Sequence, residues 1–357
     1  MDPAALRAEF PVLDELAYLN AGTCGPLPVA AVQGAAGVLE MAAREGRSQK
    51  YFESTMASRA TLRSAYAQLL AGDPDDVALT TCTSEGIVRV LAALDLQRGD
   101  EVLTSDEEHP GVQGPLAAAR QQRGVAIRVV PFAQIAAAIA PSTKLVACSH
   151  VSWVSGRVAS DLTRAEVPVL LDGAQGVGAV PTDVAALGCA FYAGSGQKWL
   201  CGPVGSGMLW ISPQWRERLP ASGPTYLNLD NPAAGLDAVP HAGAARHDAS
   251  ALSHETTAAA VAALGVLGGA GWDAVHDRAA TLAAELAAAL ADSGREVAPR
   301  DRTTLVSWED ADPAATRARL AAAGVVIRDL PATGLLRASV GAWNDSTDIE
   351  RLLSALP

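Results

Sequence analysis

A lysine and an aspartate in this chain each follow a short apolar run, and they are 26 residues apart. Asp172 ends the run VPVLLD (167–172), and Lys198 follows the run CAFYAGS (189–195). Polar residues at the ends of buried strands in an α/β sheet gather at the edge where ligands bind. There a lysine amine can form an imine with an aldehyde, and a carboxylate can keep a ring nitrogen protonated. The pair therefore indicates chemistry on an aldehyde carried by a cationic ring.

Lysine is scarce in this chain, which narrows the choice of a reactive amine. Lys50, Lys144 and Lys198 are the only lysines among 27 lysine and arginine residues. A lysine is usually a solvated surface residue, yet Lys198 lies between an apolar run and Trp199-Leu200. Any lysine that the chemistry requires must be one of these three, and its surroundings favour Lys198.

A phosphate site is predicted where the run VALTT (77–81) ends. Thr83 and Ser84 follow it and open a helical stretch. The free N–H groups and the positive dipole end of a helix bind phosphate. Ser195 and Gln197, just before Lys198, add side-chain donors. Ser84 has a second interpretation as a simple helix cap, and capping is compatible with phosphate binding.

Two further side chains are suited to holding a flat ring. His109 follows the run EVLTS (101–105) and is placed to stack on a ring face, and Gln175 follows Asp172 and can bond a ring hydroxyl. Taken singly, Asp172 is also a turn residue and His109 a loop histidine. An aldehyde, a ring nitrogen, a hydroxyl and a phosphate together describe pyridoxal 5'-phosphate, which we predict as the cofactor.

The elements that position these residues alternate between strands and helices. This alternation, with buried runs such as VLL, predicts an α/β fold with a mostly parallel sheet covered on both faces. A long helical pattern at 29–70 precedes it. The expected strands are 77–81, 101–105, 127–132, 144–152, 167–172 and 189–195, and the expected helices are 84–94, 111–123, an Ala/Ile stretch after 132 and VAALG after Thr182-Asp183.

The C-terminal part is predicted to be a smaller α+β domain. It follows a loop-rich stretch at 213–253 and should contain a long Ala-rich helix over 254–293. Helices at 313–323 and 346–355 alternate with TTLVSW (303–308), GVVIRD and LLRASV. We expect an N-terminal segment over 1–20 that packs near the small domain, a large cofactor-binding domain over 21–253 and a small domain over 254–357.

Composition excludes several other classes of protein. The formal charge of -12 and the absence of a basic run argue against nucleic acid and membrane partners and favour a small molecule. The five cysteines are odd in number and contain no CxxC, so reduced thiols and a cytoplasmic location are expected. His241, His247 and His254 lack metal-ligand spacing, so no metal is expected.

Several segments together resemble the class V aminotransferase family of fold-type I pyridoxal phosphate enzymes. They are VLLDGAQGVGAVPTDVAALGCAFYAGSGQKWLCGPVGSGML, LTSDEEHPGV, TCTSEGI and LRASVGAWND. The family includes cysteine desulfurases, C–S lyases and isopenicillin N epimerase-like enzymes. D-x-A-Q followed by S-G-x-K is the specific part of the likeness. The resemblance begins at YLNAGTCGPLP and covers nearly the whole chain, so it implies the family's two-domain fold with a seven-stranded sheet.

The resemblance also implies a role for each matching position. Lys198 would be the Schiff-base lysine, and Asp172 would lie at the pyridine nitrogen. Arg337 would bind the substrate carboxylate, for which its planar fork is suited. The remaining assignments are Gln175 at the ring hydroxyl, His109 on the ring, and Ser84, Ser195 and the Thr83 backbone at the phosphate. Ser250 would reach the phosphate of a second subunit, which implies a homodimer with a shared active site.

The chain departs from the family pattern at three places. Gln197 stands where relatives commonly carry a histidine, and it can donate a hydrogen bond but cannot titrate. Trp153 stands where desulfurases carry an asparagine. With Thr23 and residues 221–232 it is expected to shape the substrate pocket. Desulfurases carry a catalytic cysteine shortly before the substrate arginine, whereas the last cysteine here is Cys201.

These departures favour elimination over persulfide formation. A lyase needs a base that removes the substrate's α-proton, and the substrate's side chain must carry a leaving group. Lys198 can be that base. The predicted function is therefore a C–S lyase that eliminates from an amino acid. An aminotransferase, or an epimerase, is the alternative. A binding protein of the same fold without catalysis is the second alternative.

Overall fold

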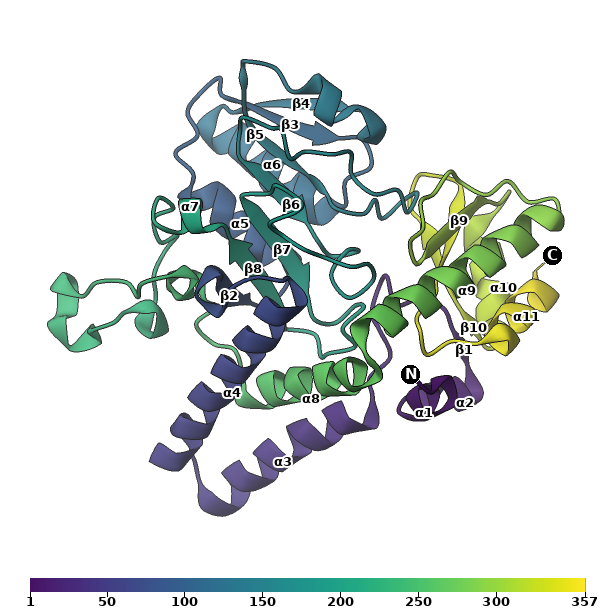
Figure 1. Ribbon diagram of the computed structural model, residues 1–357, viewed down its shortest axis with the longest axis horizontal. Helices are drawn as coiled ribbons and strands as arrows, with labels where there is room; N and C mark the ends of the chain where they lie inside the picture. The colour runs from purple at the N-terminus through teal and green to yellow at the C-terminus, as the bar shows by residue number, and fades with distance from the viewer. Residues whose placement is uncertain (357) are drawn as a thin grey trace.

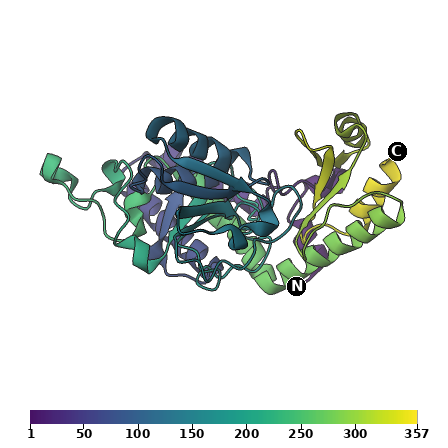
Figure 2. The ribbon, with the colours of Figure 1, turned by 90° about the horizontal axis from the view of Figure 1, so that it is seen from above.

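The computed structural model describes residues 1–356. The chain forms two lobes, a large one around a seven-stranded sheet and a small one that contains the C-terminal segment from α9 (Trp272–Asp292) onward (Figures 1 and 2). Helix α9 runs from one lobe to the other along the small lobe.

The large sheet has the strand order β2-β8-β7-β6-β5-β3-β4. Strands β3 to β7 are parallel to one another, whereas β8 is antiparallel to both β7 and β2. The expected mostly parallel sheet is therefore confirmed, and β8 is a strand that the sequence pattern had not indicated. The strands are β2 (Val77–Thr80), β3 (Glu101–Ser105), β4 (Ala126–Val130), β5 (Thr143–Ser149), β6 (Val169–Asp172), β7 (Phe191–Ser195) and β8 (Gly207–Ile211).

Helices cover both faces of this sheet, which explains why its central strands are apolar throughout. Leu170 packs with α5 (Thr83–Ala93) and α6 (Pro110–Arg123) on one face. Its neighbour Leu171 packs on the other face, in the cluster that includes side chains of α4 (Gln49–Leu69) and α8 (His254–Ala270). Because successive side chains of a strand point to opposite faces, both faces require apolar residues.

Two long helical patterns are each divided by a glycine. The pattern at 29–70 forms α3 (Val29–Glu45) and α4 (Gln49–Leu69), with Gly46 at φ 73° between them. The pattern at 254–293 forms α8 (His254–Ala270) and α9, bent by 81° at Gly271, whose φ is 86°. A positive φ ends a helix and favours glycine. The single helices expected in these two places are therefore wrong.

Two short predicted helices are also wrong. VAALG forms turns at 184–188, and the Ala/Ile stretch forms only 3₁₀ turns at Phe132–Gln134 and Ala136–Ala138. Both segments are too short to offset the cost of starting an α-helix.

The small lobe is built on a three-stranded antiparallel sheet of order β11-β12-β9. The N-terminal segment contacts this lobe, because β1 pairs with β10 and Arg7 Nη1 lies 2.7 Å from Asp348 Oδ2. The elements are α1 (Pro3–Ala8), α2 (Val12–Glu15), β1 (Ala17–Tyr18), β9 (Leu305–Glu309), α10 (Pro313–Ala322), β10 (Val325–Val326), β11 (Arg328–Leu330), β12 (Leu335–Ser339) and α11 (Ser346–Ala355).

Helix α8 packs against α3 and α4 of the large lobe. The predicted domain boundary at residue 254 remains a prediction, and the chain turns toward the small lobe at Gly271. Short α7 (Pro213–Arg216) precedes an arm at 221–243 that projects from the large lobe (Figures 1 and 2). No single helix within residues 1–356 is long and apolar enough to cross a membrane, although α8 and α9 would meet that test as one bent pair.

Candidate active site

Strand register brings the predicted site residues to one edge of the large sheet. Asp172 is opposite Ser149 of β5 and Ala193 of β7. On the other side of β7, Ser195 is opposite Gly207 of β8, which is in turn opposite Thr80 of β2. The ends of β2, β5, β6 and β7 therefore meet, as the parallel topology requires.

The first turn of α5 and the end of β7 form one polar cradle. Ser195 Oγ accepts a hydrogen bond from Thr83 N at 3.1 Å and lies 2.6 Å from Thr83 Oγ1. Cys82 precedes α5 and makes no side-chain capping bond. Ser84 faces the start of α6, because a Cβ added to Gly111 would lie 2.4 Å from Ser84 Oγ. Thr83 N is thus engaged by Ser195, whereas the N–H groups of Ser84 and Glu85 in the first turn of α5 are available to bind an anion.

His109 begins α6 and is held in one orientation. Its Nδ1 accepts a hydrogen bond from Gly111 N at 3.0 Å, and its ring meets Trp153 edge to face with centroids 4.9 Å apart. Burial, with smaller contributions from Lys198 and two arginines, lowers the pKa of His109 to about 4. The imidazole is therefore neutral at pH 7, which suits a group that packs on a cationic ring.

Lys198 and Asp172 lie close enough to influence each other's charge. Asp172 is 6% exposed, and Oδ1 accepts from Ala174 N at 2.8 Å. Burial raises its pKa, and the positive charge of Lys198 opposes that rise. Lys198 keeps some contact with solvent, yet burial lowers its pKa to about 8 while Asp172 acts in the opposite direction. The structure thus brings together the pair on which the cofactor prediction depends.

The two glutamines differ in how they are held. Gln175 Nε2 donates to Gly22 O at 2.7 Å, and its Oε1 accepts from Trp199 Nε1 at 2.9 Å. The amide nitrogen retains a second hydrogen for a ligand. Gln197 Oε1 is buried without a partner among the described residues, although its backbone oxygen accepts from Gly25 N. A buried polar atom without a partner is unusual, and a ligand would satisfy it.

Arg337 is completely buried, and two of its nitrogens have no partner in the described chain. Nη1 donates to Trp153 O at 2.8 Å, whereas Nε and Nη2 make no hydrogen bond within residues 1–356. Burial and nearby Arg328 lower its pKa to about 9, so it remains cationic at pH 7. The free edge of this guanidinium suits a carboxylate.

Arg328 is a site residue that the sequence analysis missed. Its guanidinium lies over the Trp153 ring, 5.6 Å from the centroid, and Nη1 is 3.5 Å from Thr23 Oγ1. Arg328 is the strand partner of Arg337 across β11 and β12. An arginine nine positions before Arg337 was visible in the sequence, but only the strand register places the two side by side.

The segment that contains Ser250 is anchored by a neighbouring carboxylate. Asp248 accepts from Arg59 at 2.9 Å, from Arg63 at 2.7 Å and from Leu79 N at 2.8 Å. This network joins the segment to α4 and β2. The predicted contact of Ser250 with a second subunit remains a prediction.

The residues present fit pyridoxal phosphate. The first turn of α5 suits a phosphate, and Gln197 Oε1 and two nitrogens of Arg337 have no partner in the described chain. The amine of Lys198 and the carboxylate of Asp172 lie close enough to influence each other. Among residues 1–356, no three His, Cys, Asp or Glu side chains are grouped to hold a metal.

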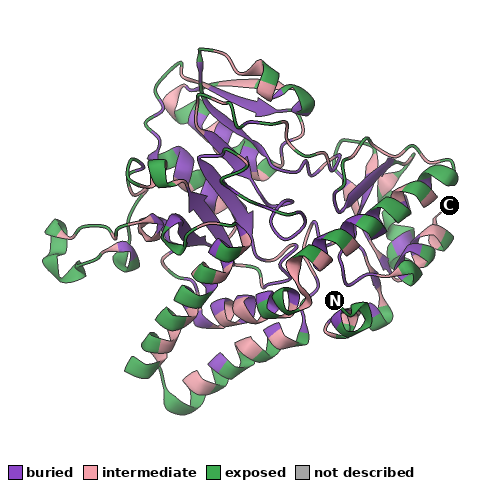
Figure 3. Cartoon of the chain, in the orientation of Figure 1, coloured by how far each residue is buried: buried purple, intermediate pink, exposed green. Residues whose placement is uncertain are grey.

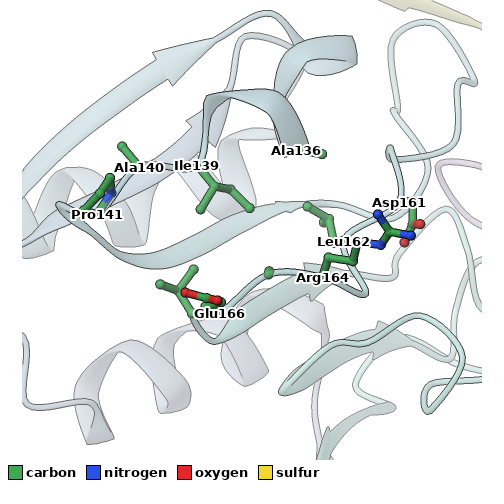
Figure 4. A pocket seen from close by; sticks show the side chains of 10 residues that line it. Ala136, Ile139, Ala140, Pro141, Asp161, Leu162, Arg164 and Glu166 are labelled. Atoms are coloured by element: carbon green, nitrogen blue, oxygen red, sulfur yellow. The ribbon is translucent and has the colours of Figure 1, made fainter.

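A surface pocket of about 610 Å³ contains none of the site residues (Figure 4). Pro141 and Val167 line it just before β5 and β6 begin, so it lies at the opposite edge of the sheet.

Two solved structures of similar proteins are informative: one contains this cofactor, and the other is of an enzyme that acts on a sulfur amino acid. A C-DES variant with glycine covalently linked to its PLP cofactor is 26% identical, with a TM-score of 0.91 and 98% of each chain covered. The cystine C–S lyase C-DES in complex with its product cysteine persulfide matches at 26% identity and a TM-score of 0.91, covering 97% of this chain and 98% of that one. The chain is a pyridoxal phosphate-dependent enzyme.

Sequence comparison identifies the family. The sequence model described as aminotransferase class-V matches residues 18–352, so the chain belongs to the class V aminotransferase family. A probable cysteine desulfurase of Pseudomonas aeruginosa is 31% identical, covering 99% of this chain and 97% of its own. Isopenicillin N epimerase of Streptomyces clavuligerus is 31% identical over 56% of this chain and 54% of its own. The predicted family and cofactor are confirmed.

Proposed function

We propose that this enzyme is a C–S lyase that eliminates from a sulfur amino acid with two carboxylates, such as cystine. The observation that carries the proposal is the pair of arginines at one wall of the site. Arg337 has a free guanidinium edge for the α-carboxylate, and Arg328 lies beside it over Trp153. A cystine-type substrate has a second carboxylate for Arg328. The likeness to a cystine C–S lyase supports the same substrate class.

The sequence also supports a lyase over a desulfurase. No cysteine follows Cys201, whereas the family resemblance places the desulfurase cysteine shortly before the substrate arginine. Elimination needs no such thiol, because the sulfur leaves with the electron pair of the Cβ–S bond.

The bound cofactor supplies an electron sink that stabilises negative charge at the substrate Cα. Asp172 would hold the ring nitrogen with a buried carboxyl group, whose pKa is raised by burial and lowered by neighbouring Lys198. His109 stays neutral and packs from the side of Trp153. Thr83, Ser84 and Ser195 would hold the phosphate at the start of α5.

Lys198 moves the proton. Because burial lowers its pKa to about 8, a substantial fraction of the amine is neutral near pH 8 and can accept the Cα proton. Arg337 fixes the α-carboxylate through its free edge, which orients that proton toward the amine. Gln197 and Thr23 complete the wall around the substrate.

The test is a product assay with cystine. Pyruvate and ammonia in equal amounts, together with a persulfide, are expected. A keto acid formed without ammonia, together with the aminated cofactor, would identify an aminotransferase instead. Racemised amino acid without keto acid or ammonia would identify an epimerase. A protein that takes up no pyridoxal phosphate would contradict all three activities.

We further propose that the enzyme is a homodimer. Large apolar side chains are exposed on α3 and α4 and on the projecting arm, where the ribbon is mostly exposed (Figure 3). They include Val32, Leu39, Phe52, Met56, Tyr226 and Leu236. Exposed apolar surface on a helix pair is typical of an interface, and in a dimer Ser250 would reach the partner's phosphate. Sedimentation should give twice the chain mass of 36.6 kDa, and a monomer at micromolar concentration would contradict the proposal.

A further inference from the structure

A second carboxyl group is buried behind the cofactor site, and the mechanism above does not use it. Glu108 lies in the turn between β3 and α6 and is 2% exposed. Its Oε1 accepts from Ser149 N at 3.0 Å and from the Ser105 hydroxyl, and its Oε2 accepts from Ser149 Oγ at 2.7 Å. The carboxylate therefore links two neighbouring strands, β3 through Ser105 and β5 through Ser149.

These hydrogen bonds connect the segments that carry two cofactor residues. His109 is the next residue after Glu108, and Gln113 Nε2 donates to the Glu108 carbonyl at 2.8 Å. On the other side, Ser149 ends β5 and is the direct strand partner of Asp172 in β6. One side chain thus spans the distance between the turn that presents His109 and the strand pair that presents Asp172.

The electrostatic setting of Glu108 is unfavourable for a purely structural carboxylate. The groups that face it are Ser105, Ser149 and the thiol of Cys148, with Asp172 as the neighbouring charge. No lysine or arginine forms an ion pair with it in the described part of the chain. Burial raises the pKa of Glu108 to about 7 although its hydrogen bonds act to lower it, and Asp172 adds to the rise. A buried charge without a cation is costly.

We infer that Glu108 is a positioning residue, which fixes the separation between His109, at the face of the cofactor ring, and Asp172, at its nitrogen. The inference deepens the proposed function, because turnover would depend on this separation. A displacement of about 1 Å in a catalytic group can reduce a rate by about 100-fold. The side chain bonds to Ser105 and Ser149 and would act through the segments that carry His109 and Asp172.

The neighbouring Glu107 is a matched control. It has the same chemistry and is adjacent in the chain, but its carboxylate accepts from the hydroxyls of Ser152 and Ser155 in the loop after β5. The Glu107 carboxylate makes no hydrogen bond to Ser149 or to β6, the strand that carries Asp172. A general effect of removing a carboxylate near the site should therefore appear equally in both variants.

The experiment compares Glu108→Gln and Glu107→Gln as enzymes loaded with pyridoxal phosphate. The first readout is the visible circular dichroism of the bound cofactor, which reports how the ring is held and requires no turnover. We expect Glu108→Gln to lose at least about half of this signal and about 10- to 100-fold in kcat, with KM changed less than about threefold. Glu107→Gln should stay within about twofold of the unchanged enzyme in both quantities.

A pH series separates positioning from loss of fold. In the unchanged enzyme the dichroic signal should change around pH 7, where Glu108 gains or loses its proton, and Glu108→Gln should lack this step. Should Glu108→Gln not fold, Ser149→Ala removes the Oγ donor and keeps the backbone donor. It should weaken the signal in the same direction, by a smaller amount.

An unchanged dichroic signal and kcat in Glu108→Gln would overturn the inference, as would equal losses in Glu108→Gln and Glu107→Gln. If Glu108→Gln does not fold, an unchanged dichroic signal in Ser149→Ala would overturn the inference. If the unchanged enzyme forms no pyruvate from cystine, the proposed function fails, while the dichroism still decides the role of Glu108.

Discussion

Asp172 raises the pKa of Lys198, and Lys198 lowers the pKa of Asp172, while burial has the opposite effect on each. Burial is the larger influence on both groups. Lys198 therefore keeps a pKa of about 8, far below that of a solvated lysine. Burial brings the pKa of the Lys198 amine close to neutral pH, and Asp172, at the end of β6, keeps that pKa from falling further.

The first prediction concerns the reactive amine. Lys198→Ala should reduce pyruvate formation by about 1000-fold or more, because no other side chain at the site supplies an amine. The visible absorbance of the bound cofactor should also change. Lys144→Ala is the control, since Lys144 is exposed on β5, and it should leave the rate within about twofold. A similar loss in both variants would contradict the assignment.

The second prediction concerns pH. Only the neutral amine reacts, so the rate at which the cofactor-free protein binds pyridoxal phosphate should rise as pH passes through about 8. Asp172 raises that pKa, so Asp172→Asn should move the midpoint to lower pH. Stopped-flow absorbance measures both profiles. A midpoint that moves to higher pH in Asp172→Asn would contradict the interaction.

The third prediction separates the two arginines. Arg337→Lys should lower kcat/KM for every amino acid substrate by about 10- to 100-fold, because lysine cannot present two parallel donors to the α-carboxylate. Arg328→Ala should lower kcat/KM for cystine by about 10-fold or more and change it less than about threefold for S-methylcysteine, which has one carboxylate. Steady-state kinetics with both substrates is the measurement. Equal losses for both substrates would refute a role of Arg328 in binding a second carboxylate.

The fourth prediction concerns the phosphate cradle. Ser195→Ala removes a hydroxyl that bonds to Thr83 and is placed for the phosphate. The Kd for pyridoxal phosphate should rise by about 10-fold, the equivalent of about 1.4 kcal/mol. Ser293→Ala, at the end of α9, is the control and should not change the Kd. Equilibrium dialysis of the cofactor-free protein measures it, and an unchanged Kd for Ser195→Ala would remove this serine from the site.

The fifth prediction concerns stability. Asp248→Ala leaves Arg59, which is 3% exposed, without the carboxylate it bonds. We expect a loss of about 3 to 5 kcal/mol in the free energy of unfolding, because an unpaired buried charge remains. Asp277→Ala breaks an exposed pair with Arg302 and should cost less than about 1 kcal/mol. Urea unfolding compares the two, and similar losses would contradict the argument.

Much of the site was predictable because polar residues follow apolar runs in a regular order. The strand ends at Asp172 and Ser195 and the helix start at Thr83 all lie where the alternating pattern indicated. Breaks within helical patterns were not predictable from periodicity. Gly46 and Gly271 end helices through positive φ values. The apolar pattern continues across Gly271, whereas the stretch around Gly46 (44–50) is polar, although the single predicted helix runs through it.

Residue types and spacing by themselves indicated the cofactor and favoured one lysine, because imine chemistry allows few side chains and this chain has three lysines. The resemblance of several sequence segments indicated the family. Contacts between distant segments were decided only by the tertiary structure. Arg328 lies beside Arg337 through strand register, and Glu108 joins β3 to β5 through hydrogen bonds. Burial likewise lowers the pKa of Lys198, and burial depends on how the whole chain packs.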